Sequence, residues 1–108
     1  MALDLPKLRR LVALDQQDAL SRFALGRKLS ESSDATELSE AVEHLQFANR
    51  KSPDHLATYH ILAKTLIQLD RKEEARSVLD EGIKRAQAVS EGMGRDLAPA
   101  MQEMRDSM

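Results

Sequence analysis

The fold is decided by residues 59–82, YHILAKTLIQLDRKEEARSVLDEG, which place apolar residues at a helical spacing twice in succession. Leu62 and Leu66 are four residues apart, which puts them on the same face of a helix. Ala75 and Leu79 repeat that interval after a polar stretch. The segment therefore predicts two consecutive helices whose apolar faces pack against each other.

A related pattern precedes this segment at a nearly fixed distance. It consists of Arg22-x-x-Leu25-Gly26-x-x-Leu29 followed by Ala41-x-x-x-Leu45 and Ala48. Three pairs of equivalent residues are each 34 positions apart, namely Ala41 and Ala75, Leu45 and Leu79, and Ala48 and Gly82. Leu25 and Leu62 are 37 positions apart, and the three extra residues fit in the connection 30–34. The chain thus contains an internal repeat.

The pattern resembles the tetratricopeptide repeat, in which a large residue, Leu-Gly, an aromatic residue, Ala, a second large apolar residue, Ala and Pro follow at set offsets. Small residues such as Gly26 and Ala63 would let paired helices approach closely, while leucines fill the space around them. Arg22 stands where the family has a large aromatic residue, and Gln87 stands where it has proline. The alternative is an unrelated antiparallel helix bundle, which would require two registers to agree by chance.

The predicted fold class is all-α, with antiparallel helix pairs stacked as a short right-handed solenoid like that of the family and a C-terminal capping helix. Composition agrees, because strong helix formers dominate and only four glycines and three prolines interrupt the 108 residues. We expect a single domain made of a half repeat at 5–17, a first repeat at 18–53, a second repeat at 54–88 and a capping helix at 96–106. The expected helices lie near 5–14, 18–30, 35–51, 53–69, 71–89 and 96–106.

Several helix ends carry recognisable signals. Two motifs resemble capping boxes, Asp34-x-x-Glu37 and Asp70-x-x-Glu73. A third, Ser52-Pro53, combines an N-cap with proline at the first helical position. We expect Gly92-Met93-Gly94 to break the chain, and Asp96 to be the N-cap of the last helix. The apolar stripe of that helix would consist of Leu97, Met101 and Met104.

The composition disfavours several classes of function. The chain has no cysteine, so neither a disulfide framework nor thiolate chemistry is expected. Its net charge of −2, with both signs mixed along the sequence, argues against a nucleic-acid-binding surface. The first ten residues meet a charge every few positions, so we expect no signal peptide, no membrane span and a cytoplasmic location.

No motif in the sequence predicts catalysis, a cofactor or a metal. His55 and His60 are five residues apart and would point in different directions from one helix, and His44 is distant in sequence. Gly92-x-Gly94 lacks the third glycine and the preceding strand of a phosphate-binding loop. We therefore expect a protein that is not an enzyme.

The resemblance implies that the first helix of each repeat lines a concave groove that holds a peptide. The residues predicted to contact such a partner are Phe23, Arg27, His60, Lys64 and Ile67. Arg27 and Lys64 occupy equivalent positions, and both would suit acidic side chains or a C-terminal carboxylate. Phe23 could equally pack against the leading half repeat, and the two cations could be ordinary solubilising charges.

The predicted function is a protein–protein interaction module, a scaffold or adaptor that binds a partner polypeptide. The family's carboxylate clamp for chaperone tails has Lys and Asn where this sequence has Phe23 and Arg27, so an adaptor of that kind is not predicted. The alternative is a self-associating protein, such as a homodimer. About two and a half repeats would leave open helix ends for a second copy to cover.

Overall fold

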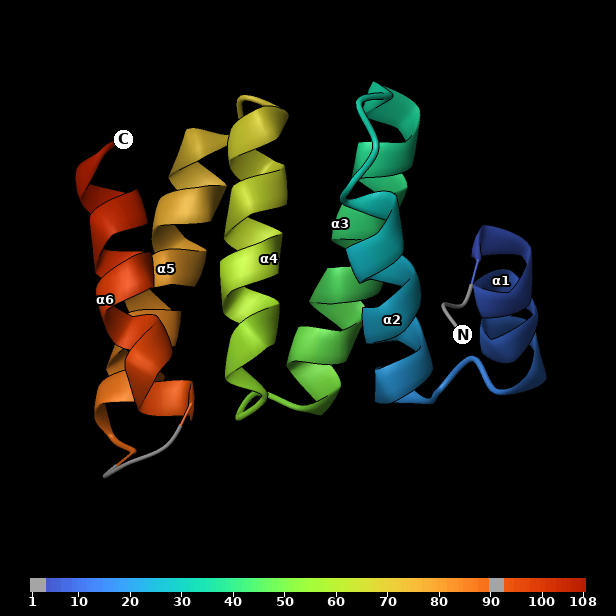
Figure 1. Ribbon diagram of the computed structural model, residues 1–108, viewed down its shortest axis with the longest axis horizontal. Helices are drawn as coiled ribbons and strands as arrows, with labels where there is room; N and C mark the ends of the chain where they lie inside the picture. The colour runs from blue at the N-terminus through green and yellow to red at the C-terminus, as the bar shows by residue number, and fades with distance from the viewer. Residues whose placement is uncertain (1–3, 90–92) are drawn as a thin grey trace. The chain divides into compact units, whose positions relative to one another are not determined.

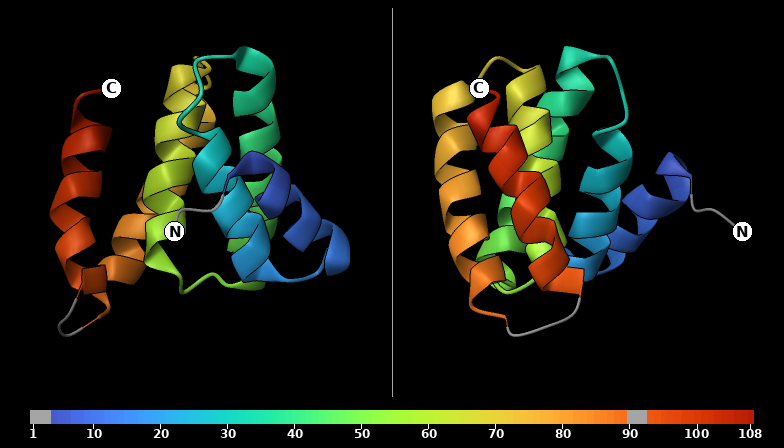
Figure 2. Two further views of the ribbon diagram at one scale, coloured as in Figure 1. Left: turned by 45° about the vertical axis from the view of Figure 1, so that its right-hand side comes forward. Right: turned by 60° about the vertical axis from the view of Figure 1, so that its left-hand side comes forward.

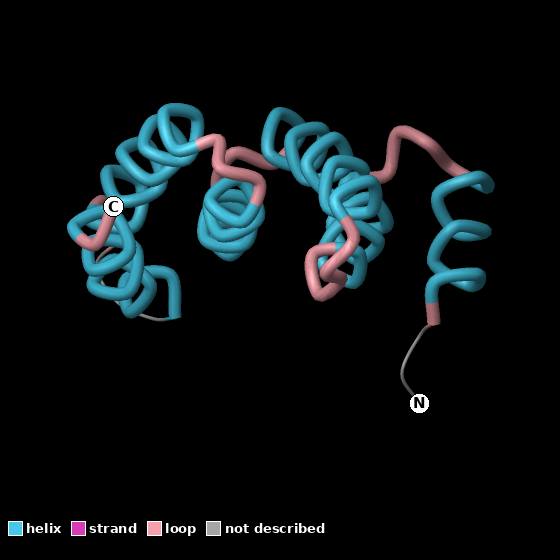
Figure 3. The backbone as a smooth tube through the Cα atoms, turned by 90° about the horizontal axis from the view of Figure 1, so that it is seen from above, coloured by secondary structure: helices cyan, strands magenta, loops and turns pink. Residues whose placement is uncertain are grey.

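The chain folds into helices joined by short connections. The computed structural model describes residues 4–89 and 93–108, in which it contains no strand (Figures 1 and 3). The helices are α1 (Leu5–Leu14), α2 (Ala19–Leu29), α3 (Ala35–Lys51), α4 (Leu56–Gln68), α5 (Lys72–Gln87) and α6 (Met93–Asp106). The predicted all-α class is confirmed, and the ranges 5–14 and 35–51 are confirmed without change.

The helices group into two compact units, Met1–Pro53 and Asp54–Met108. In the first unit, α2 packs against both α1 and α3. In the second unit, α5 packs against α4 and α6, and α6 also contacts α4. Consecutive helices within a unit run in opposite directions, and α6 lies beside α5 (Figures 1 and 2). The boundary between the units falls where the second repeat was predicted to begin.

The core of the first unit depends on a close approach of α2 and α3. Leu25, Leu29 and Leu45 are almost completely buried there. A Cβ atom added to Gly26 would lie 2.8 Å from Cγ of Leu45 and 3.3 Å from the carbonyl oxygen of Ala41. Because real Cβ atoms do not approach so closely, glycine is what permits this helix pair to pack with Leu45 in place.

The core of the second unit also depends on a glycine where helices approach closely. Leu62, Leu66 and Leu79 are buried between α4 and α5, as predicted. A Cβ atom added to Gly82 would lie 2.7 Å from Cβ of Tyr59 and 2.9 Å from Sδ of Met101. Glycine at this point of α5 therefore lets α4 and α6 both pack closely against it. The predicted capping stripe is confirmed, because Met101 is fully buried and its two partners on α6 are half-buried.

The predicted cap of α3 is confirmed. Asp34 accepts a hydrogen bond from the backbone N–H of Glu37 at 3.2 Å. Ser32 strengthens this start, since its hydroxyl accepts from the N–H of Asp34 and donates to the carboxylate of Glu37. The connection 30–34 is a loop, as expected. Asp18 caps α2 in the same manner through the N–H of Ser21, which the sequence analysis missed.

The predicted start of α4 at Ser52-Pro53 is wrong. The helix begins at Leu56, with His55 as its N-cap, and Pro53 lies in a turn. Ser52 is instead the C-cap of α3, and its N–H donates to the carbonyl oxygen of Ala48 at 2.8 Å. A residue that ends one helix in this way is not free to start the next one, so the connection is longer than predicted.

The predicted capping box at Asp70 is also wrong. Asp70 has a φ of 59°, and the N–H of Arg71 donates to the carbonyl oxygen of Leu66 at 2.8 Å. The N–H of Asp70 donates to Ile67, which completes the paired hydrogen bonds of a Schellman turn at the end of α4. Asp70 therefore ends α4 and does not start α5. Arg71 is the N-cap of α5 and makes no side-chain capping bond.

The last helix begins earlier than predicted. Of the expected break at 92–94, Gly92 lies outside the described residues, whereas Met93 and Gly94 belong to α6. Asp96 is consequently in the first turn of α6 and is not its N-cap, which is a correction. A carboxylate in this turn still interacts favourably with the positive end of the helix dipole. None of the helices in the described ranges is long and apolar enough to cross a membrane.

Candidate functional site

The predicted partner-binding residues of the first unit lie on α2. Arg27 is exposed in the last turn of this helix, and Phe23 is half-buried one turn earlier. The two side chains are four residues apart and share one side of α2. Phe23 is thus intermediate between a core residue and a surface residue.

The predicted residues of the second unit lie on α4. Lys64 is exposed, whereas His60 and Ile67 are half-buried. Burial lowers the pKa of His60, and the neighbouring cation of Lys64 lowers it further. At neutral pH, α4 therefore presents one positive charge beside a neutral imidazole.

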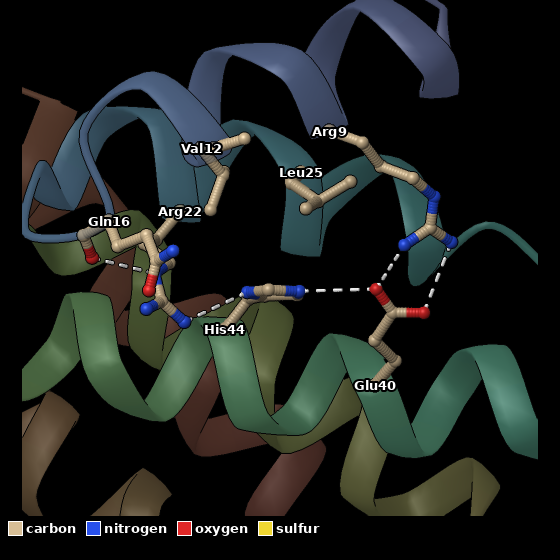
Figure 4. Close-up of a pocket in the computed structure, with 8 residues that line it drawn as sticks. Arg9, Val12, Gln16, Arg22, Leu25, Glu40 and His44 are labelled. Atoms are coloured by element: carbon tan, nitrogen blue, oxygen red, sulfur yellow. Dashed lines mark hydrogen bonds and ion pairs between the residues drawn. The ribbon is translucent and has the colours of Figure 1, made fainter.

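A second candidate site, which the sequence analysis missed, is a pocket within the first unit (Figure 4). Its volume is about 310 Å³. Its walls come from α1, α2, α3 and the connection after α1, and the lining residues are Arg9, Val12, Ala13, Gln16, Arg22, Leu25, Glu40 and His44. We call it the α1 pocket.

Helical spacing brings these side chains to the pocket. Arg9 and Val12 are three residues apart on α1, as are Arg22 and Leu25 on α2. Glu40 and His44 are four residues apart on α3 and are hydrogen bonded to each other, so they form an adjacent pair on its surface. The charged groups stand around the opening in Figure 4, with Val12 and Leu25 between them.

Glu40 is the acidic member of the pocket, and its charge is compensated. Arg9 donates to both of its carboxylate oxygens, with 3.1 Å between Nη2 of Arg9 and Oε1 of Glu40. His44 also lies within hydrogen-bonding distance, with 3.2 Å between its Nε2 and Oε2 of Glu40. The hydrogen bonds from Arg9, together with the contact to His44, hold the pKa of the Glu40 carboxyl below its usual value. The ion pair links α1 to α3.

Arg22 contacts the imidazole of His44 on the side opposite Glu40. Nη1 of Arg22 lies 3.3 Å from Nδ1 of His44. The other ring nitrogen of His44, Nε2, faces the carboxylate of Glu40. The imidazole of His44 thus lies between the guanidinium of Arg22 and the carboxylate of Glu40 and contacts both.

Arg22 is held in place by contacts that involve no carboxylate. Its Nε donates to the carbonyl oxygen of Gln16 at 3.0 Å, and its guanidinium carbon lies 4.3 Å from the centroid of the Phe47 ring. Arg22 takes part in none of the ion pairs found among residues 4–89 and 93–108. Arg22 thus joins the segment before α2 to α3, in the position where the repeat pattern has a large aromatic residue.

The pocket left only a weak signal in the sequence. The spacing of Glu40 and His44 is visible as an i, i+4 pair, but Arg9 is 31 residues before Glu40. Which acidic residue pairs with which arginine depends on how α1 packs, and the repeat pattern does not specify that. In the described part of the chain, no group of three or more His, Asp or Glu side chains is arranged to hold a metal ion.

The comparisons with known proteins agree with the repeat pattern. The sequence model of the tetratricopeptide repeat family matches residues 33–91, more than half of the 108-residue chain. The protein therefore belongs to the tetratricopeptide repeat family, and membership implies a protein-interaction module. The matched region contains α3, α4 and α5. No curated protein and no solved structure matches the sequence significantly.

Proposed function

We propose that the protein is a scaffold or adaptor without catalytic activity, which binds a partner polypeptide through the exposed sides of α2 and α4. Arg27 and Lys64 carry this proposal. They occupy equivalent positions in the two repeats, both are exposed, and neither belongs to an ion pair within the part of the chain that the structure describes. Each is free to pair with a carboxylate of the partner.

The residues beside these cations would supply apolar contacts. Phe23 precedes Arg27 by one helical turn, and His60 and Ile67 flank Lys64 on α4. A half-buried aromatic ring next to a charge is a common anchor in protein interfaces. The partner that fits is a protein or peptide with acidic side chains or a C-terminal carboxylate.

The experiment is a titration of a partner recovered from the native cell lysate. Phe23→Ala should weaken binding more than Arg27→Gln or Lys64→Gln, because a buried aromatic anchor contributes more than an exposed ion pair. The two cation variants should mainly slow association and reduce its salt dependence.

The matched control replaces two exposed lysines of α5, Lys72 and Lys84, with glutamine. It removes two positive charges from a different helix and should leave affinity unchanged. Equal affinity of the wild type and the triple variant of Phe23, Arg27 and Lys64 would reject the proposed surface. Loss of folding in Phe23→Ala would assign that residue to the core.

Self-association is a second candidate function, favoured by exposed leucines in the first unit. Leu14 at the end of α1 is 83% exposed, and Leu20 at the start of α2 is 69% exposed. A contact with a second copy of the chain would remove these apolar side chains from water, which is favourable. Light scattering should then detect a dimer that Leu14→Glu together with Leu20→Glu converts to a monomer. A wild-type monomer at high concentration would exclude this candidate.

A further inference from the structure

The α1 pocket contains a positive charge that its own acidic group does not neutralise. Glu40 is paired with Arg9, which donates to both of its carboxylate oxygens, and Arg22 contacts the imidazole of His44 but no carboxylate. The guanidinium of Arg22 is therefore left without an anionic partner among the described side chains. Its contacts with a carbonyl oxygen, a ring nitrogen and the Phe47 ring fix its position and leave its charge unchanged.

The remaining walls limit the kind of anion that fits. Val12 and Leu25 are buried aliphatic side chains, and Ala13 leaves space beside them at an exposed position. A volume of about 310 Å³ lies at the lower end of the range for small-molecule pockets, roughly 300–1,000 Å³. A small anion with an aliphatic part and a single charge matches these walls.

We propose that the α1 pocket binds a small aliphatic carboxylate. The carboxylate pairs with Arg22, and the aliphatic part packs against Val12 and Leu25. The hydrogen bond between the carboxylate and the guanidinium is charge-assisted, which makes it stronger than a hydrogen bond between neutral groups. Such a group could belong to a free small acid or to the C-terminal residue of a polypeptide.

A phosphate fits the site less well. It carries up to two charges and offers three acceptor oxygens, so it calls for several donors. The guanidinium of Arg9 already donates to both carboxylate oxygens of Glu40, which leaves Arg22 as the main cationic donor. None of the residues that line the pocket is among the partner-binding residues proposed on α2 and α4, so the two proposals are tested separately.

The first test compares probes of matched shape. The full chain, labelled with ¹⁵N, is titrated with N-acetyl-leucine, with its neutral amide and with inorganic phosphate, and amide chemical shifts are followed. N-acetyl-leucine should shift signals around Arg22 and Val12, and the neutral amide should bind about tenfold more weakly or worse, the loss expected for one charge-assisted hydrogen bond. Equal binding of acid and amide, tighter binding of phosphate, or no binding of the acid at millimolar concentration would overturn the proposal.

A peptide that ends in leucine then separates the two sources of the carboxylate. Tighter binding of the peptide than of N-acetyl-leucine, abolished by C-terminal amidation, assigns the site to a polypeptide terminus. Equal affinity assigns it to a free acid. Either result agrees with the proposal, because the carboxylate is needed for binding in both cases.

The second test uses variants of the pocket. Arg22→Gln removes the charge, and Ala13→Phe fills the space while leaving Arg22 in place, so each should weaken binding of N-acetyl-leucine at least about tenfold. The matched control is Arg10→Gln, which removes the same charge from an exposed position on α1 that does not line the pocket. Ala13→Phe keeps the test valid if Arg22→Gln fails to fold. Retained affinity in Ala13→Phe, or equal loss in Arg10→Gln, would refute the assignment.

Discussion

Arg22 and Phe47 stack with 4.3 Å between the guanidinium carbon and the ring centroid, so a cation fills the place that the repeat pattern reserves for an aromatic residue. The stack joins α2 to α3, and the hydrogen bond from Arg22 to Gln16 extends the link to the connection between α1 and α2. The departure from the family pattern therefore preserves the contact between neighbouring elements through different chemistry.

Replacing Arg22 with methionine should lower the free energy of unfolding by about 1–2 kcal/mol, because the apolar stem remains while the cation–π contact and two hydrogen bonds are lost. Urea denaturation followed by circular dichroism measures the change. Arg10→Met, at an exposed position of α1, is the control and should stay within about 0.5 kcal/mol of the wild type. A similar loss in both variants would mean that the stack does not stabilise the unit.

Leu62→Ala should destabilise the protein by about 2–5 kcal/mol, since Leu62 is 1% exposed and its removal leaves a cavity between α4 and α5. The same chemical change at Leu14, which is 83% exposed, should cost less than about 0.5 kcal/mol. Thermal unfolding of the two variants side by side gives the comparison. Equal losses would contradict the assignment of Leu62 to the core.

Asp70 supplies a test of the turn between α4 and α5. Its φ of 59° lies in the left-handed region that glycine adopts without strain. Asp70→Gly should therefore raise the free energy of unfolding by about 0.5–1 kcal/mol, and Asp70→Ala should lower it. If Asp70→Ala proved the more stable variant, the Schellman turn would be absent in solution.

His60 should make stability depend on pH in the mildly acidic range. Its pKa in the folded protein is below the ordinary value of 6.5, so the unfolded chain takes up a proton first as the pH falls. The contribution of His60 is complete above about pH 6.5 and is lost as the pH falls from that value towards the lower pKa of the folded state. His60→Gln should show a smaller drop in melting temperature between about pH 8 and about pH 5.5. Identical slopes for the two proteins would show that His60 is not desolvated, since their other histidines are shared.

The sequence was sufficient to predict the helices because each of them depends on local spacing. Leu62, Leu66 and Leu79 identify their own helices and faces, and the 34-residue interval relates the repeats to one another. The ends of the helices were harder to predict, because a residue between two helices can cap the end of the first or the start of the second. Ser52 and Asp70 both have the chemistry of an N-cap, yet each ends the preceding helix.

The charged part of the α1 pocket could not be predicted for a different reason. Arg9 and Glu40 meet only because α1 packs beside α2 and α3, and neither residue belongs to the repeat pattern. Arg22 was recognised as a departure from that pattern, but its partners lie on other elements. The partner-binding residues on α2 and α4 stay a prediction, which the partner titration tests.

Few residues of α1 are buried, and this affects how often the wall of the α1 pocket opens. Only Leu8 and Val12 of this helix are buried, whereas α5 buries five residues. Amide hydrogens of α1 should therefore exchange with solvent through local opening, long before those of α5. Each such opening dismantles the wall formed by Arg9, Val12 and Ala13, so an occupant must be bound while the helix is closed. Slower exchange of the α1 amides, with no change in α5, would report occupancy of the pocket directly.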